Sequence, residues 1–459
     1  MKALVIGLGQ SGEWAARLLR SRGAQVLVQD RTESPALAAR AAALSEAGIE
    51  VRLGCAPTPG AALDLCVLSP GIPLDSPGVL ALRACGIPVV SELELAWRHS
   101  RGRILAITGS AGKSTLAKLC CETLRAAGLR AALGGNYGPP LSRLVLEAAD
   151  AEWLVVEASS FQLESVHAFC PRIGVLLNLH PNHLDRHRTM AAYERAKARL
   201  VSGMHGEGTV IVGSGVRGRL RRRLRELGVA DGPAVWWTVG LSNKADYRYA
   251  DGYVSVPAPD ARAGQGGRSR IRVAGTWFDN PVLGVAAAAA AAVTASCGLP
   301  FEALARALAR FEPLPHRMQP AGEVRGVRFV DDSKATTLSA LRAALQMSGE
   351  RVRLIAGGRL KERKLGVPKK ELAKKVDAVY LIGESASVLA ETWGTVVRCR
   401  VCGNLRDAVR RAWTDARAGD VVLLAPGCAS FDQFRGYEDR GEQFCRLVGG
   451  LAGEEETEA

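Results

Sequence analysis

The sequence contains the stretch Ile104-Leu-Ala-Ile-Thr-Gly-Ser-Ala-Gly-Lys-Ser-Thr115, in which an apolar strand runs into a glycine-rich turn and then a helical pattern. Glycines let backbone N–H groups turn toward phosphate oxygens, and the following helix presents its positive N-terminus. Lys113 adds a point charge, and a neighbouring hydroxyl can reach Mg²⁺. The stretch therefore predicts a triphosphate cradle, although its glycines lie closer together than in the general phosphate loop. Without a phosphate, the same residues would form an ordinary capped helix start.

Length and composition indicate a large globular protein. At 459 residues the chain is long enough for about three domains, and 47% apolar with 23% charged residues is a globular composition. No run approaches the ~20 apolar residues of a membrane span, and the first apolar run is too short for a signal peptide, so we expect a cytoplasmic protein. The eleven cysteines are irregularly spaced and lie mostly in apolar segments. This is typical of small core residues in a reducing compartment.

The chain is basic. Its net charge is +14, and the run Arg217-Gly-Arg-Leu-Arg-Arg-Arg-Leu-Arg225 could form a basic helix face. A charge run is usually a solvated face, and neither interleaved aromatic residues nor a nucleic-acid motif accompanies this one. We therefore expect no nucleic-acid partner, with a basic nucleic-acid-binding ATPase as the alternative. A positive field would equally steer acidic, nucleotide-linked substrates.

The N-terminal residues have a βαβ pattern. An apolar strand over 2–6 runs into Gly7-x-Gly9-x-x-Gly12, a helix follows, and a second strand ends at Asp30. The glycines permit a tight turn and the close approach of a phosphate, and Asp30 could bond a ribose hydroxyl. Such a fingerprint indicates a nucleotide-like ligand without naming it. A nicotinamide dehydrogenase and a turn without any ligand are the alternatives.

Two continuous apolar runs in the middle of the chain, 153–157 and 173–178, are typical of strands buried in a parallel sheet. The carboxyl ends of such strands face the ligand crevice, where chemistry is expected. A carboxylate and an imidazole beside a triphosphate cradle would suit Mg²⁺, although Mg²⁺ prefers oxygen ligands and each histidine alone could be structural. The polar residues that follow these runs are Glu157, Asn178, His180 and His183.

We place domain boundaries near residues 100 and 312, after a polar segment and where two prolines interrupt a helical pattern. Four strand-like runs follow the second boundary, at 327–330, 352–356, 378–382 and 421–425, and alternate with amphipathic helices. Asp332 and Lys334 could line a binding edge there or form a surface ion pair. The expected fold is α/β, with three domains on largely parallel, doubly wound sheets at 1–100, 101–312 and 313–450, then a disordered tail at 451–459.

A series of motifs, in chain order from residue 4 to about 445, resembles those of the Mur ligase family. The segment 159–164 and the last motif favour the members that add D-glutamate over their sister ligases. The motifs are Gly109-Ser-Ala-Gly-Lys-Ser-Thr115, Gly134-Gly-Asn136, Glu157-Ala-Ser-Ser-Phe-Gln-Leu-Glu164, His183-Leu-Asp-Arg186, Tyr193-Glu-Arg-Ala-Lys197, Leu314-Pro-His-Arg317, Asp332-Ser-Lys-Ala-Thr336 and Pro426-Gly-Cys-Ala-Ser-Phe-Asp-Gln-Phe434.

The resemblance implies a Rossmann-like N-terminal domain, a central ATP-binding domain and a Rossmann-like C-terminal domain. It also implies an ATP-dependent ligase that adds D-glutamate to UDP-N-acetylmuramoyl-L-alanine through an acyl phosphate, in peptidoglycan precursor synthesis. The expected ligands are ATP, Mg²⁺ at two sites and these two small-molecule substrates, and the expected assembly is a monomer. A Mur-type or folylpolyglutamate-type ligase with another acceptor or amino acid is the alternative.

The resemblance also implies residue roles. Catalysis falls to Lys113, Glu157, His183 and Lys197, of which Lys197 corresponds to a lysine that is carbamylated in the family. Mg²⁺ would be held by Ser114, Glu157 and His183. ATP would contact Gly109, Ser110, Ala111, Gly112, Lys113, Ser114, Thr115, Asn280, Arg317, Asp332 and Lys334. The UDP substrate would bind at Ser11, Asp30, Arg31, Gly71 and Asn136, and D-glutamate at Thr336, Lys361, Ser430 and Tyr437.

Overall fold

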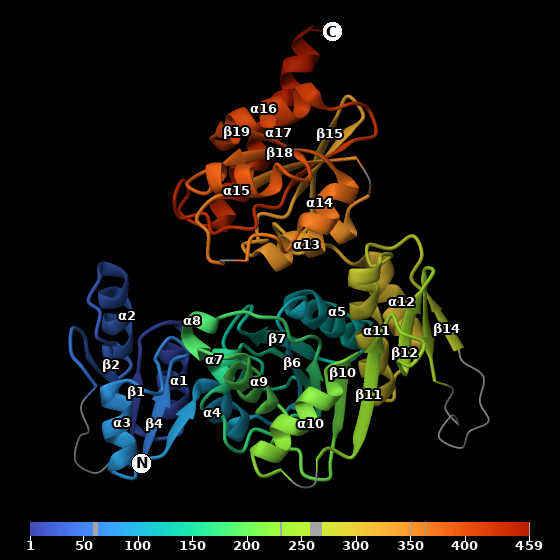
Figure 1. The fold of residues 1–459 in the computed structure, drawn as a ribbon. Coiled ribbons are helices and arrows are strands. Elements are labelled where there is room, and N and C mark those ends of the chain that lie inside the picture. The colour runs from blue at the N-terminus through green and yellow to red at the C-terminus, as the bar shows by residue number, and fades with distance from the viewer. Residues whose placement is uncertain (58–62, 230–231, 258–268, 350, 363, 459) are drawn as a thin grey trace. The chain divides into compact units, whose positions relative to one another are not determined.

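The structure is a computed structural model that describes residues 1–57, 63–229, 232–257, 269–349, 351–362 and 364–458. Three β-sheets organise the chain (Figure 1). Backbone contacts divide it into two compact units. The first unit comprises Met1–Asp279 with Leu283–Phe311, and the second comprises Asn280–Val282 with the chain from Glu312 onward. Within the described ranges, every helix is too short or too polar to pass through a bilayer.

The first sheet has five parallel strands in the order β3-β2-β1-β4-β5. Its apolar strands are buried on both faces, as expected of a parallel sheet. The strand order reverses between β1 and β4, and the turns after two such strands are where a ligand crevice is expected in an open α/β sheet. The elements are β1 (Lys2–Ile6), α1 (Gln10–Ser21), β2 (Gln25–Gln29), α2 (Pro35–Glu46), β3 (Glu50–Arg52), β4 (Leu65–Leu68), α3 (Pro77–Ala84), β5 (Val89–Ser91) and α4 (Glu92–His99).

The second sheet has nine strands in the order β14-β13-β12-β11-β10-β9-β6-β8-β7. Only the pairs β12–β13 and β13–β14 are antiparallel. The central strand β6 lies between β9 and β8, so the loop that follows β6 stands where the strand order reverses. The strands are β6 (Arg103–Thr108), β7 (Ala131–Gly135), β8 (Trp153–Glu157), β9 (Ile173–Leu176), β10 (Thr209–Gly213), β11 (Val235–Gly240), β12 (Tyr247–Ala250), β13 (Tyr253–Val256) and β14 (Ser269–Arg272).

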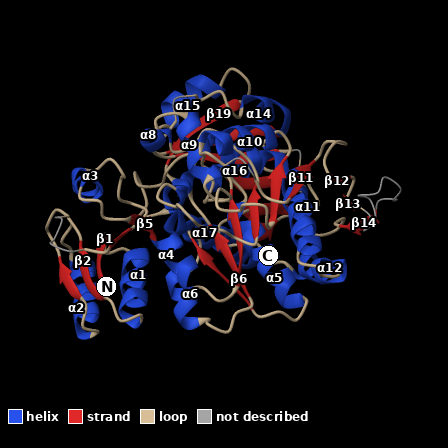
Figure 2. Cartoon of the chain, turned by 90° about the horizontal axis from the view of Figure 1, so that it is seen from below, coloured by secondary structure: helices blue, strands red, loops and turns tan. Residues whose placement is uncertain are grey.

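Helices pack around this second sheet, and Figure 2 shows its strands in red among the blue helices. Helix α5 follows β6 directly and packs on β7, β8 and α12. The helices are α5 (Lys113–Ala126), α6 (Leu141–Glu147), α7 (Ser160–Leu163), α8 (Leu184–His187), α9 (Met190–Ala198), α10 (Arg217–Glu226), α11 (Pro281–Ser296) and α12 (Phe301–Arg310).

The third sheet has the order β15-β16-β20-β17-β18-β19, with only the edge strand β15 antiparallel to its neighbour. The four expected strands are present as β16 (Val327–Asp331), β17 (Val352–Gly357), β18 (Val376–Ile382) and β20 (Val421–Leu424), and β15 (Gln319–Val324) and β19 (Arg398–Gly403) add both edges. The helices are α13 (Leu338–Met347), α14 (Lys369–Lys375), α15 (Ala386–Trp393), α16 (Leu405–Asp415) and α17 (Tyr437–Glu458).

Three largely parallel sheets confirm the predicted fold class. The end of the chain differs from the expectation. Helix α17 continues through Glu458, into the acidic segment for which the sequence predicts disorder. Glutamate has a high helix propensity, so this segment can prolong a helix that has already formed.

The polar segment before residue 100 contains the helix α4, whose residues 92–96 are buried. Glu92 and Glu94 of α4 are 1% and 0% exposed. Glu92 accepts a hydrogen bond from the backbone N–H of Ser142 at 2.6 Å, and Glu94 accepts from the N–H groups of His167 and Ala168. These carboxylates therefore join the last helix of the first sheet to segments of the second sheet.

We predict that Glu94→Ala lowers the free energy of unfolding of the first unit by about 3 kcal/mol, because it removes the buried acceptor of two part-buried N–H groups and the ion-pair partner of Arg98. Glu147→Ala is the matched control, since Glu147 pairs with Arg143 on the surface and both side chains are nearly half exposed. That variant should change the free energy by less than about 0.5 kcal/mol. Urea unfolding checks both values, and equal losses would contradict the structural role of Glu94.

Candidate active site

The glycine-rich loop lies between β6 and α5. Gly109 and Gly112 have φ values of +156° and +80°, which glycine adopts without strain. The side-chain oxygen of Asn178, just after β9, accepts hydrogen bonds from the N–H groups of Ser110 and Ala111, each at 2.9 Å. Asn178 thus lies at the strand edge where the sequence predicts chemistry. Its amide holds the loop in shape.

A buried hydroxyl–carboxylate pair lies at the start of α5. Ser114 Oγ donates to Glu157 Oε2 at 2.6 Å, and Asn136 Nδ2 donates to Glu157 Oε1 at 2.9 Å. Glu157 is 2% exposed. A Cβ at Gly135 would come within 2.2 Å of the Glu157 carbonyl oxygen, so glycine is needed for β7 to bring Asn136 this close. The structure therefore brings together three of the predicted site residues.

This donor set fits Mg²⁺, which prefers oxygen ligands and commonly takes one or two from protein with the rest from phosphates and water. In the part of the chain that the structure describes, no group of three or more His, Cys, Asp and Glu side chains is arranged to hold a metal. Phosphate oxygens and water would therefore have to complete the coordination of an ion at Ser114 and Glu157.

Lys197 of α9 lies directly beneath the loop. It is 2% exposed, and its ammonium group donates to the Gly109 carbonyl at 2.9 Å and to Thr108 Oγ1 at 3.1 Å. Burial lowers the pKa of Lys197 well below its usual value, and the charge of Lys113 lowers it further, although Glu157 acts in the opposite direction. Lys197 is therefore far more readily neutral than an exposed lysine, and a neutral amine is nucleophilic.

His183 begins helix α8 in the left-handed region, with φ +54°. Its ring packs edge-on against Phe161, with 4.8 Å between centroids. Partial burial lowers the pKa of His183, the charges of Lys197 and Lys113 lower it further, and Asp185 opposes them. Its imidazole is thereby biased toward the neutral form, which is the form that binds metals.

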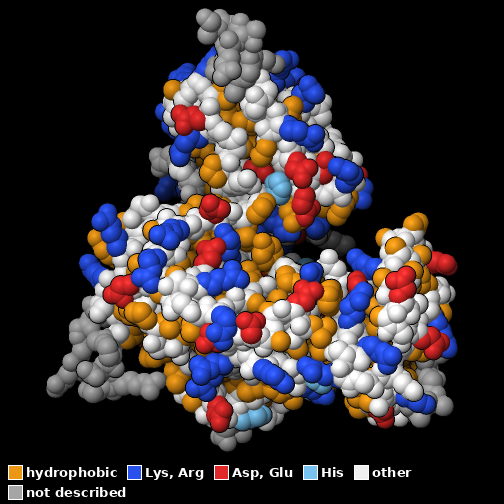
Figure 3. Space-filling view, turned by 180° about the vertical axis from the view of Figure 1, so that it is seen from behind, with side chains coloured by type: hydrophobic (Ala, Val, Ile, Leu, Met, Phe, Trp, Pro, Cys, Tyr) orange, Lys and Arg blue, Asp and Glu red, His pale blue; other side chains and the backbone are white. Residues whose placement is uncertain are grey.

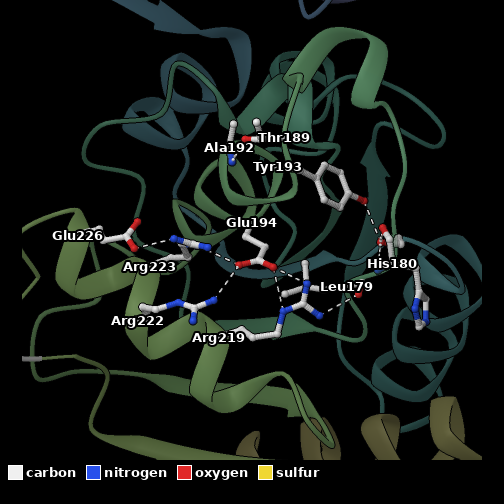
Figure 4. A network of polar contacts seen from close by, with 11 residues as sticks. Leu179, His180, Thr189, Ala192, Tyr193, Glu194, Arg219, Arg222, Arg223 and Glu226 are labelled. Carbon is white, nitrogen blue, oxygen red and sulfur yellow. Dashed lines mark hydrogen bonds and ion pairs between the residues drawn. The ribbon is translucent and has the colours of Figure 1, made fainter.

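The arginine run of the sequence forms α10 and holds α9 in place (Figure 4). Arg219 and Arg223 each donate through Nε to the carboxylate of Glu194 at 2.9 Å, and Arg219 also donates to the Leu179 carbonyl at 3.0 Å. Burial raises the pKa of Glu194, but the bonds from both arginines outweigh it, so the net shift is downward. Glu194 lies one helical turn before Lys197, so this network anchors the helix that carries the buried lysine.

Two other arginines of the run, Arg217 and Arg221, lie over the ring of Trp236 at 5.7 and 5.2 Å. Most arginines of the run therefore contact other side chains of the protein, although Arg221, Arg222 and Arg225 remain exposed. On the face drawn in Figure 3, basic side chains are scattered among acidic and apolar ones. The absence of a nucleic-acid partner stays a prediction.

The crevice of the first sheet is framed by the turns after β1 and β4. Ser69 Oγ donates to the Gly7 carbonyl at 2.8 Å and joins the two turns. The Asp30 carboxylate accepts from the N–H groups of Leu8 and Thr32, so it shapes the glycine turn in addition to any contact with a ligand. Gly71 borders open space, since a Cβ there would have no neighbour within 4 Å. Ser11 and Arg31 lie at the same edge, at the start of α1 and just after β2.

In the second unit, the strand end of β16 carries two buried carboxylates. Asp331 pairs with His316 at 2.7 Å, and Asp332 accepts from the N–H of Met318 at 3.1 Å. Burial raises the pKa of Asp332 to about 8, against the charge of Arg317. Asp332 is 9% exposed, so the surface ion pair considered for it is wrong. Lys334 lies over the ring of Tyr437, 3.5 Å from its centroid.

The residues predicted to bind D-glutamate come from neighbouring loops of this unit. A backbone bridge between Arg359 and Ala429 brings the segments of Lys361 and Ser430 together. Thr336 lies two residues after Lys334, whose ammonium group contacts Tyr437.

Asn280, which is predicted to contact ATP, accepts a hydrogen bond from the backbone N–H of Val282 at 3.2 Å.

Arg440 was not identified from the sequence, although it shapes this edge. It is fully buried and donates to Ser333 Oγ at 3.0 Å, to the Ser333 carbonyl at 2.9 Å and to the Cys428 carbonyl at 3.3 Å. It therefore ties the turn after β16 to the turn after β20. The sequence does contain a sign of this buried role, because Arg440 lies on the apolar face of α17 with Phe444, Val448 and Leu451.

Three family models match the chain in order. They are the Mur ligase MurD-like N-terminal domain over residues 1–91, the Mur ligase middle domain over 107–258 and the Mur ligase glutamate ligase domain over 316–428. Curated proteins named UDP-N-acetylmuramoylalanine–D-glutamate ligase from Acidobacterium capsulatum and Anaeromyxobacter dehalogenans are 38% and 39% identical. Each comparison covers 97% of this chain and, respectively, 96% and 97% of the relative.

Solved structures show the same fold. The MurF ligase from Thermotoga maritima in complex with ADP has a TM-score of 0.59 at 17% identity, over 86% of this chain and 90% of that one. The UDP-N-acetylmuramate–alanine ligase MurC from Thermotoga maritima has a TM-score of 0.58 at 16% identity, over 98% and 99% of the two chains.

We predict a pH-dependent stability that depends on Asp332. Between the ordinary carboxyl pKa of about 3.9 and the raised value near 8, the folded state binds a proton that the unfolded state has lost. The free energy of unfolding should therefore fall as the pH rises through this window. Asp332→Asn should flatten that part of the slope and be more stable than the wild type at about pH 8.5.

Urea unfolding of the ligand-free protein across this pH range measures the slope. Asp377→Asn is the control, because the Asp377 side chain is about half exposed and it should retain the wild-type slope. A wild-type slope in the Asp332 variant would contradict the burial argument.

Proposed function

The chain belongs to the Mur ligase family, and on that premise we propose that it joins D-glutamate to UDP-N-acetylmuramoyl-L-alanine with ATP, as a cytoplasmic monomer in peptidoglycan precursor synthesis. Relatives named for that reaction support the assignment, because the similarity extends over nearly the whole of both chains. The structural observation that carries it is the buried contact between Ser114 and Glu157 at the start of α5.

The reaction requires a carboxylate to become an acylating group. One oxygen of the substrate carboxylate bonds to the γ-phosphorus of ATP as the bond to ADP breaks, which gives an acyl phosphate. The amine of D-glutamate then attacks the acyl carbon, inorganic phosphate leaves with its bonding electrons, and the amine loses a proton. Both steps develop negative charge on phosphate oxygens, so positioned positive groups are the main catalytic requirement.

The residues around the loop suit that requirement. Lys113 and the N-terminus of α5 would hold the ATP phosphates, and Ser114 with Glu157 would hold one Mg²⁺. His183, with its pKa lowered, would hold the second. Bound Mg²⁺ would neutralise charge that builds up on the transferring phosphoryl group.

We assign a carbamate to Lys197. In this modification the neutral amine bonds to the carbon of CO₂ and releases a proton, which replaces a buried cation with an anion. Its low pKa favours the reactive neutral form, and the nearby charge of Lys113 favours the anionic product. The carbamate would also supply oxygen acceptors beneath the loop.

The remaining roles follow the order of the three sheets. We assign the UDP substrate to residues 1–100, with Ser11, Asp30, Arg31 and Gly71, and Asn136 contributing from the central domain. ATP falls to residues 101–312, with Asn280, and to Arg317, Asp332 and Lys334. D-glutamate falls to residues 313–450, with Thr336, Lys361, Ser430 and Tyr437.

A phosphate-release assay tests the function. Protein, UDP-N-acetylmuramoyl-L-alanine, D-glutamate, ATP and Mg²⁺ should release phosphate only when all are present. L-glutamate, other amino acids and a folate acceptor form the comparison panel. Release with another amino acid or with folate would reassign the substrate within this class of ligases, and no amino-acid-dependent release across the panel would refute the ligase itself.

We predict that Lys197→Ala lowers kcat at least about 100-fold and that short carboxylic acids restore part of the activity, because they replace the carbamate oxygens. Lys244→Ala, at an exposed lysine of the same unit, is the control and should keep wild-type activity with or without the acids. Initial rates across an acetate series measure the rescue. Full activity of Lys197→Ala without any added acid would contradict the carbamate.

A further inference from the structure

Arg186 connects the His183 segment with the first sheet. It lies in α8, three residues after His183. Its Nη1 donates to the carbonyls of Pro70 and Gly71 at 3.3 and 3.1 Å, and its Nη2 donates to the carbonyl of Ile72 at 3.0 Å. One planar guanidinium thus binds three consecutive carbonyls of the turn that follows β4, a task that suits its fixed fork of donors.

The guanidinium of Arg186 also contacts two side chains of the segment 159–164. Glu164 Oε2 accepts from Nη2 at 2.7 Å, and the two side chains are only 15% and 19% exposed. The ring of Phe161 lies under the guanidinium, 4.8 Å from Cζ. Phe161 and Glu164 both belong to the segment 159–164 that follows Glu157, and the chemistry described so far gives neither of them a task. A partly buried arginine that donates to several acceptors and stacks on an aromatic ring is held much more firmly than a surface one.

The turn that Arg186 holds is part of the first-sheet crevice. Residues 70–72 follow β4, at the reversal of strand order, and Ser69 joins them to the glycine turn after β1. Gly71 borders open space at this edge. On the other side, Phe161 contacts the rings of both His183 and His187. Arg186 therefore lies between a crevice suited to a nucleotide-linked ligand and the segment that carries His183.

We propose that Arg186, braced by Glu164 and Phe161, is a positioning residue that holds the turn 70–72 in register with His183. A nucleoside-diphosphate-linked carboxylic acid bound in the first-sheet crevice is thereby presented to the phosphate loop in a fixed geometry. This role rests on the proposed function for its substrate. Arg186 acts through backbone carbonyls and touches no reacting atom.

The chain offers a matched control in the same two segments. Arg188, two residues further on, pairs with Asp75 at 3.1 Å, and these side chains are 80% and 68% exposed. Exposed pairs of this kind contribute little. Arg186→Ala and Arg188→Ala therefore remove the same charge from the same helix region, but only the first removes the clamp.

The first experiment needs no substrate. Hydrogen–deuterium exchange is measured on the ligand-free full chain for peptides that cover residues 66–76. Exchange there should rise in Arg186→Ala, stay at the wild-type level in Arg188→Ala, and return partly in Arg186→Lys, which keeps the charge but loses the fork. Unchanged exchange in Arg186→Ala would overturn the proposal, and so would a rise spread over the whole unit, since that marks a general loss of stability.

The second experiment separates the two substrates. In Arg186→Ala the KM for the UDP-linked acid should rise about tenfold or more, while the KM for ATP changes less than about twofold, because a displaced substrate loop leaves the phosphate loop intact. Equal changes in both KM values, or none, would overturn the positioning role. An inactive wild-type protein would refute the proposed function instead, and the exchange result would still decide whether Arg186 holds the turn.

Discussion

Burial of charge at the edge of a parallel sheet is the constraint on which the first unit depends. Glu157 and Lys197 are each only 2% exposed, and a buried charge is costly unless hydrogen bonds replace its water. Glu157 therefore accepts from Ser114 and Asn136, and Lys197 donates to the loop itself. These bonds fix the start of α5 and the position of the loop, and the close approach of the Glu157 carbonyl requires glycine at position 135. The hydrogen bonds that stabilise these buried groups are therefore the ones on which the proposed chemistry would also depend.

The segment 159–168 has a second structural role, because it receives contacts from both sheets of the unit. Glu164 and Phe161 hold Arg186, which reaches the turn after β4, and the backbone N–H groups of His167 and Ala168 bond to Glu94 of α4. The segment that follows Glu157 at the end of β8 therefore connects the two sheets.

Local sequence patterns predicted much of the fold, but they did not predict contacts between residues that lie far apart in the sequence. Continuous apolar runs predicted β6, β8 and β9, and the glycine loop with its lysine predicts a phosphate site, because each pattern depends on neighbours in sequence. The edge strand β15 was missed, since Pro320 and Gly322 disfavour a strand and are tolerated only at an edge. The sequence analysis predicts no role for Glu94 or Arg186. Their backbone partners in the other sheet's segments lie at least 73 and at least 114 residues away, so no local pattern could reveal these contacts.

Several arginines have structural roles that the charge composition of the chain does not reveal. Arg186, Arg219 and Arg440 lie on three different helices, and each donates to backbone carbonyls at strand-end turns as well as to a side-chain oxygen. A lysine could reach such groups one at a time, whereas the planar fork binds several at once and fixes their relative position. Some of the arginines that contribute to the net charge of +14 therefore serve to hold these turns. The turns held by Arg186 and Arg219 follow β4 and β9 of the first unit, so these cations would also favour the approach of the anionic substrates proposed above.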